Sequence, residues 1–169
     1  MKIPPRSLRS LPPRGRVSGL GRPGATDMVR HVSEFLVEFG DCDPAQIVFY
    51  PNFLRWMDAA SLRYFGALGV PPWQMRPERI EDHIIGTPIV DLHTRFVAPA
   101  TYGDRIHIET SIVAWRTKSF VMEHVIKRGE TVLVEGREVR VFARRHPDDP
   151  SRIQAVPVPP AIRARCEAG

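Results

Sequence analysis

The chain has 169 residues, of which 43% are hydrophobic, and its formal net charge is +5. This length suits one domain whose core needs neither disulfides nor a metal for stability. Positions 1–26 carry six basic residues and no acid, which leaves 18 basic and 19 acidic residues for the rest of the chain. The folded part is therefore expected to be nearly neutral, which argues against nucleic-acid binding, and no apolar run is long enough for a membrane span.

Proline and arginine dominate residues 1–28, and we expect this segment to be a disordered basic tail. It precedes a predicted domain over residues 29–160 and a C-terminal tail over residues 161–169. The two cysteines, Cys42 and Cys166, form no CxxC motif, a usage typical of a cytoplasmic protein. Cys42 is predicted to be a small buried side chain. The histidines show no metal-ligand spacing, so no metal or cofactor is expected.

The first predicted element is a half-buried strand over residues 33–39, where aromatic and aliphatic side chains alternate with glutamates. Asn52 is a favourable helix N-cap, and apolar residues then recur at three- and four-residue spacing over 53–68. This pattern predicts one long amphipathic helix, which Gly69 ends. Residues 74–84 predict a loop.

Alternating patterns then predict four strands and a short last one, over residues 84–96, 105–115, 119–127, 131–144 and 153–158. One helix followed by antiparallel strands indicates an α+β fold in which a curved sheet wraps the helix. An open sheet has edges that must be paired or covered, and pairing with a second copy does this. We therefore expect a homo-oligomer.

Two carboxylates and a proline precede the predicted helix start, in Gly40-Asp41-Cys42-Asp43-Pro44. Pro44 disfavours the α region at Asp43 and so predicts an extended backbone there. A turn of this kind can hold an acid near the free N–H groups of a helix start, an arrangement suited to breaking an acyl bond. The alternative is that both aspartates only cap turns.

Ordered blocks of sequence extend this turn through most of residues 30 to 160. They are Phe39–Asn52, Arg55–Ser61, Gly69–Trp73, Gly86–Val90, Tyr102–Asp104, Ile108–Thr110, Trp115–Phe120 and Val139–Ala143. Together they resemble the 4-hydroxybenzoyl-CoA thioesterases of the hotdog-fold superfamily. The resemblance implies a hotdog fold with an active site at a dimer interface, in a homodimer or homotetramer. It also implies hydrolysis of an aromatic acyl-CoA, either 4-hydroxybenzoyl-CoA or benzoyl-CoA, to the free acid and CoA.

The resemblance also assigns roles to individual residues. Asp43 would attack the thioester carbonyl or activate water for that attack, and the backbone N–H of Tyr50 would polarise the carbonyl. Asp58 would read the 4-hydroxyl of the acyl group across the subunit interface. Two alternatives remain for Asp58. It could lie on a solvated helix face, or it could be the catalytic acid that another branch of the superfamily places on this helix.

Further matching positions concern substrate binding. Thr87 and Ser119 would line the acyl pocket, with Phe49 nearby, and Arg116, Lys118 and Arg152 are candidates for the CoA phosphates.

The chain departs from the resembled enzymes around the pocket. Gln46 and Phe49 stand where those enzymes have a glycine and a tryptophan, and Thr117 and Gln154 replace arginines. Two rival functions therefore stay open: a thioesterase for short aliphatic acyl-CoA, and a non-catalytic acyl-CoA-binding protein. A hotdog dehydratase is disfavoured because no histidine lies near the Asp turn in the sequence, and His107 and His124 are predicted to be structural.

Overall fold

The structure is a computed structural model that describes residues 29–70 and 83–168. Its elements are β1 (Arg30–Leu36), the 3-10 turn η1 (Phe39–Asp41), α1 (Pro51–Ala67), β2 (Ile89–Phe96), β3 (Arg105–Trp115), β4 (Ser119–Arg128), β5 (Thr131–Arg145), β6 (Ile153–Val156) and α2 (Pro160–Ala168). The predicted tail over residues 1–28 lies outside the described residues, as does most of the predicted loop over residues 74–84.

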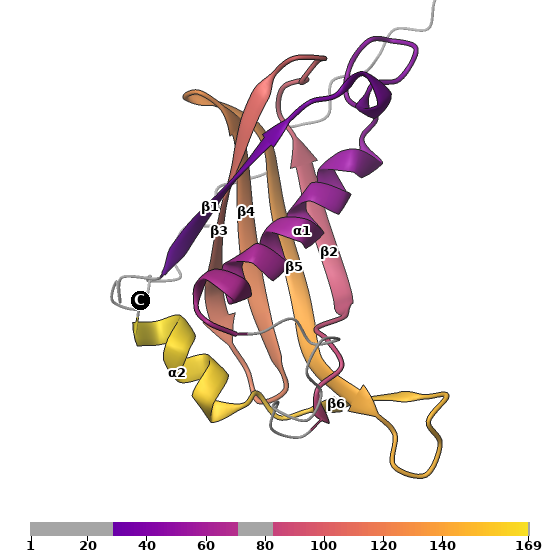
Figure 1. Cartoon of the computed structure of the whole chain (residues 1–169), viewed down its shortest axis with the longest axis vertical. Helices are drawn as coiled ribbons and strands as arrows, with labels where there is room; N and C mark the ends of the chain where they lie inside the picture. Colours follow the sequence, from indigo (N-terminus) through magenta and orange to yellow (C-terminus); the bar gives the residue numbers. More distant parts are fainter. Residues whose placement is uncertain (1–28, 71–82, 169) are drawn as a thin grey trace, which may run out of the picture.

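One antiparallel sheet curves around α1 (Figure 1). Its strand order is β1-β3-β4-β5-β2, with β6 paired to β5. The core fills the space between sheet and helix, and Phe53, Met57 and Phe65 of α1 are buried in it. The helix crosses β5 at Gly136, where a Cβ atom would collide with the sulfur of Met57. The predicted α+β hotdog architecture, a curved sheet wrapped around one long helix, is confirmed.

The sheet has two ends that matter for the site. At the Asp-turn end, Leu36 pairs with Arg105, and α1 begins close by. At the opposite end, which we call the β6 end, Trp115 pairs with Phe120 and β6 and α2 follow (Figure 1). The eleven residues of β3 join the two ends. At about 3.3 Å per residue, they separate the ends by roughly 35 Å.

The helix start differs from the predicted one. Tyr50 is the N-cap and Pro51 the first helical residue, whereas Asn52 was the predicted cap. Proline at this position needs no hydrogen-bond acceptor and already has a helical φ. The side chain of Asn52 instead donates from Nδ2 to the carbonyl of Asp41 at 2.9 Å. Asn52 therefore ties the Asp turn to the helix.

Two strands differ from their predicted bounds. The first has the predicted length but lies three positions earlier, so that it ends at Leu36 and the exposed Phe39 lies in η1. The strand predicted to begin at residue 84 is regular only from Ile89 onward, although Gly86 forms an isolated bridge with Ala143. Pro88 contributes no N–H to a strand ladder, and this shortens β2.

The C-terminal residues form an element that the sequence did not indicate. Helix α2 covers most of residues 161–169, which we had expected to be a tail, and it buries Ile162 and Cys166. The phenol of Tyr64 lies against Cys166, and burial raises the pKa of that thiol to about 11. Apolar contact with the core, rather than helix propensity, holds this short helix in place.

Candidate active site

The Asp turn is a closed loop at the start of α1. Cys42 and Val48 form a β-bridge across it, and inside it the N–H of Asp43 donates to the carbonyl of Ile47 at 2.9 Å. The N–H of Gln46 returns to the carbonyl of Asp43 at 2.8 Å, and Gln46 has a φ of 65°. Cys42 is half-buried rather than fully buried because it stands at the mouth of this turn. The loop fixes the backbone of Asp43 on both sides.

The two carboxylates of the turn are used differently. Asp41 accepts the N–H of Glu38 through Oδ2 at 2.9 Å and so closes the 3-10 turn. Asp43 accepts the N–H of Ala45 through Oδ1 at 2.8 Å. Among the described residues, no donor contacts Oδ2 of Asp43. Both aspartates therefore cap turns, while Asp43 keeps one carboxylate oxygen without a donor among the described residues.

Tyr50 supplies a free donor beside this turn. The N–H groups of Phe49, Asn52 and Phe53 all donate to backbone carbonyls. The N–H of Tyr50, in contrast, meets no acceptor in the part of the chain that the structure describes. It lies at the positive end of the α1 dipole, where an anionic oxygen is stabilised.

An apolar hollow of about 300 Å³ adjoins Tyr50. The rings of Tyr50 and Phe96 line it, with their centroids 6.2 Å apart, and the ring of Phe49 lies on Tyr50 with a centroid distance of 5.4 Å. These three rings are about half exposed. Exposed rings grouped at one place are typical of a surface that binds a ligand or another protein. Phe49, predicted near the acyl group, thus flanks the predicted oxyanion donor.

A second pocket, of about 530 Å³, lies toward the β6 end between α1 and the start of β2. Asp58 and the buried Thr87 line it, together with Arg140 of β5. The carboxylate of Asp58 is 65% exposed and accepts from Arg140 at 2.7 Å. The structure therefore brings Asp58 and Thr87 together at one pocket, where Asp58 is both exposed and paired with Arg140.

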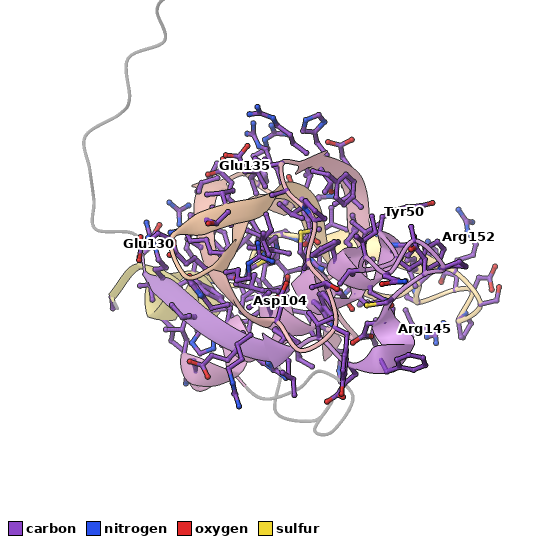
Figure 2. All side chains as sticks on the ribbon, turned by 90° about the horizontal axis from the view of Figure 1, so that it is seen from above. Tyr50, Asp104, Glu130, Glu135, Arg145 and Arg152 are labelled. Carbon is purple, nitrogen blue, oxygen red and sulfur yellow. The ribbon has the colours of Figure 1, made fainter. Side chains whose placement is uncertain are left out.

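The remaining predicted residues lie at the β6 end. Ser119 is half-buried at the first position of β4, and its carbonyl accepts the N–H of Arg116. Arg116 and Lys118 are exposed in the β3–β4 turn, and Arg152 is exposed in the β5–β6 turn. Figure 2, a view along the long axis, shows Arg152 on the same flank as Tyr50. The start of α1 and the β5–β6 turn lie at opposite ends of the domain along this axis (Figure 1).

Within one chain, the predicted residues therefore form two half-sites. Asp43, Phe49 and Tyr50 are at the Asp-turn end, whereas Thr87 and Ser119 are near the β6 end. Neither the hollow beside Tyr50 nor the pocket beside Asp58 contains both groups.

Sequence reasoning missed a buried polar cluster beneath Asp58. Arg140 donates from Nε to Oε2 of Glu138 at 2.6 Å, and Glu138 also approaches His124 at 3.4 Å. Ser61 is 3.4 Å from the same carboxylate. Burial raises the pKa of Glu138, but the hydrogen bond from His124 and the charge of Arg140 more than offset this and lower it overall. The signal in the sequence was two charged residues at core-facing positions of β5.

This cluster is not a serine-hydrolase triad. Ser61 and Glu138 both approach Nε2 of His124, whereas a triad needs the serine and the acid on opposite ring nitrogens. Nδ1 of His124 faces Thr110 at 3.0 Å, and Ser61 donates to the carbonyl of Met57. His124 is buried, so its predicted structural role agrees with this geometry.

Residues 29–70 and 83–168 contain neither a cluster of metal ligands nor a membrane-spanning helix. No group of three or more histidine, cysteine or acidic side chains there could hold a metal ion. None of the helices in this part of the chain is long and apolar enough to cross a membrane.

Comparison with known proteins places this architecture in a family. The model of the thioesterase-like superfamily matches residues 37–166. The chain belongs to this superfamily.

Three relatives show which members of this superfamily the chain is similar to. The chain is 48% identical to 4-hydroxybenzoyl-CoA thioesterase of Pseudomonas sp. (strain CBS-3), over 73% of this chain and 87% of that protein. A crystal structure of a 4-hydroxybenzoyl-CoA thioesterase variant with 4-hydroxybenzoyl-CoA is 43% identical, with a TM-score of 0.73 over 81% of this chain and 98% of that one. A gentisyl-coenzyme A thioesterase is 35% identical, with a TM-score of 0.66 over 80% and 98%. The resemblance to the 4-hydroxybenzoyl-CoA thioesterases is confirmed.

Proposed function

We propose that this member of the thioesterase family hydrolyses an aromatic acyl-CoA, either 4-hydroxybenzoyl-CoA or benzoyl-CoA, to the free acid and CoA. The observation that carries the proposal is the Asp turn, in which Asp43 uses one carboxylate oxygen for the N–H of Ala45 and which leads directly to Tyr50, whose N–H has no acceptor among the described residues. The names of the relatives support the acyl class, since 4-hydroxybenzoyl and gentisyl groups are both hydroxylated rings. The two free cysteines are consistent with a cytoplasmic location.

Asp43 then acts on the thioester carbonyl while the N–H of Tyr50 stabilises the oxyanion. In one route, Asp43 attacks the carbonyl carbon, CoA leaves as the thiolate, and water hydrolyses the resulting mixed anhydride. In the other, Asp43 takes a proton from the water that attacks. A single turnover in H₂¹⁸O with enzyme in excess detects the anhydride route when water attacks the aspartyl carbon of the anhydride. Water attack on the acyl carbon labels only the product, whereas attack on the aspartyl carbon labels Asp43.

A second copy of the chain completes the site in this proposal. Strand β2 is an edge of the sheet and exposes Val90, Leu92 and Phe96. Two β2 strands that pair antiparallel about a two-fold axis place the Phe96 end of one copy against the Ile89 end of the other. The Tyr50 hollow of one subunit then faces the Asp58–Thr87 pocket of its partner. Arg116, Lys118 and Arg152 of the same β6 end are placed to bind the CoA phosphates.

Subunit mixing tests this shared site. We expect Asp43→Asn and Thr87→Trp to be inactive separately, and their co-refolded mixture to recover about a quarter of wild-type turnover. The recovery arises because each mixed dimer contains one site with neither substitution. Lack of recovery by a mixture in which differently tagged copies co-purify as mixed dimers contradicts the shared site. Light scattering distinguishes a dimer from a tetramer.

The proposed reaction is tested by release of free thiol from a panel of acyl-CoA substrates. We expect aromatic substrates to give a higher kcat/KM than acetyl- or butyryl-CoA. A preference for the aliphatic substrates supports the short-chain thioesterase instead. Binding of acyl-CoA without thiol release supports the non-catalytic binding protein.

A further inference from the structure

Arg140 connects three parts of the acyl-pocket wall. Its guanidinium, only 5% exposed, donates to Glu138 from Nε at 2.6 Å and to Asp58 from NH2 at 2.7 Å. It also donates from NH1 to the carbonyl of Thr87 at 3.0 Å. These acceptors come from β5, α1 and the segment before β2. One side chain thus fixes both residues that the proposed function assigns to the acyl group in this pocket.

Stability alone does not explain why the ion pair between Glu138 and Arg140 is buried. Glu138 is 1% exposed and Arg140 5% exposed, and they share the core face of β5 with Phe142 and Val134. Removing two charges from water costs several kcal/mol, and apolar side chains of similar volume are often as stable. Oε1 of Glu138 even lacks a hydrogen-bond partner among the described residues. A buried ion pair that is present despite this cost is consistent with a role in positioning Asp58 and Thr87.

We propose that Arg140, held by Glu138, is a positioning residue that determines selection of the acyl ring. It occupies Oδ1 of Asp58 and keeps the carboxylate over the pocket, so that Oδ2 is directed at the ring substituent. A hydroxyl on the ring donates to Oδ2. An unsubstituted ring leaves that oxygen without a donor in a closed site, which costs affinity. The inference rests on the proposed function, because it takes Asp58 to contact the acyl group.

The test measures the preference for 4-hydroxybenzoyl-CoA over benzoyl-CoA as a ratio of kcat/KM. Arg140→Met alone would leave Glu138 buried and unpaired, so the main variant is Glu138→Gln/Arg140→Met, in which both charges are removed. We expect the ratio to fall at least about tenfold, because 4-hydroxybenzoyl-CoA loses a hydrogen bond that benzoyl-CoA never makes. Arg140→Lys keeps the charge but not the planar donor fork. We therefore expect its ratio to lie between that of the wild type and that of the double variant.

Arg137→Met is the matched control, since Arg137 is an exposed arginine of the same strand. We expect it to leave the ratio unchanged. A folded double variant with the wild-type ratio overturns the inference, as does an equal fall in Arg137→Met.

Binding separates this inference from the proposed function. In the Asp43→Asn background, calorimetry gives the affinities for both CoA esters without turnover. We expect 4-hydroxybenzoyl-CoA to lose about tenfold in affinity on Glu138→Gln/Arg140→Met, and benzoyl-CoA to lose little. Equal losses, or none, overturn the positioning role whatever the hydrolysis assay shows. Absence of thiol release by wild type counts against the proposed function alone.

Discussion

The two half-sites hold their carboxylates in opposite ways. Asp43 is fixed by bonds within a few residues of itself, to Ala45, Gln46 and Ile47. Asp58 is fixed by Arg140, which is 82 positions away in the chain. The comparison indicates that the half proposed to be catalytic can be built by local chain geometry, whereas the half proposed to select the substrate depends on the packing of the sheet. Changes in the first half should affect turnover, and changes in the second should affect the choice of acyl group.

The largest effect is expected from Asp43→Asn, which should change turnover but not the choice of acyl group. The amide is similar in size and can still accept the N–H of Ala45, but it is a very poor base and nucleophile. We expect turnover to fall at least about 10²-fold with every acyl-CoA, because a general base contributes at least that factor. Thermal unfolding should show that the fold is retained. A folded variant with more than half of wild-type turnover would shift the catalytic role to Asp58.

Asp58→Ala should instead change the choice of substrate. A hydrogen bond from a phenol to a carboxylate contributes about 1.5–3 kcal/mol, which is roughly 10- to 150-fold in kcat/KM. We expect the preference for 4-hydroxybenzoyl-CoA over benzoyl-CoA to fall by this factor. The two values of kcat/KM, measured in wild type and variant, provide the check. An unchanged preference would mean that Asp58 does not read the hydroxyl.

Acid should destabilise the folded protein through protonation of Glu138, which holds Arg140 beneath Asp58. Its pKa is lowered in the folded protein relative to the ordinary value of 4.5, so it contributes stability above that value and loses it as the pH falls through the folded pKa. We therefore expect the free energy of unfolding to decrease below about pH 4.5, and to decrease less in Glu138→Gln. Urea unfolding at pH 7 and pH 4 measures both. Parallel curves for the two proteins would contradict the role of Glu138.

The smallest effect is expected in the Asp turn itself. Gln46 has a φ of 65°, a left-handed conformation that costs a residue with a side chain about 1–2 kcal/mol. Gln46→Gly removes this cost but adds freedom to the unfolded chain, so we expect a net gain of about 0.5–1 kcal/mol. Gly40→Ala, also at an exposed position but without a positive φ, is the control. Chemical denaturation measures the difference, and a loss of stability in Gln46→Gly would show that the Gln46 side chain supports the turn.

The sequence by itself determined the elements that depend on neighbouring residues. The apolar spacing over 53–68 predicted α1 because a helix presents every third or fourth residue to one face. Alternation predicted β3, β4 and β5, and Pro44 marked the turn that holds Asp43. Local rules were less successful at boundaries: they placed the helix start at Asn52 instead of Pro51. They also missed α2, whose few apolar residues become significant only when they pack against the core.

Only the tertiary structure decided what surrounds Asp58. The sequence pattern does not connect Asp58 with Arg140, or Ser61 with His124, because such contacts depend on how α1 lies across the sheet. The structure also placed Asp43 and Thr87 at different ends of the domain, although their sequence blocks gave no indication of this. Hydrogen bonds along the chain are fixed by nearby residues, whereas the meeting of distant side chains depends on the packing of the whole core.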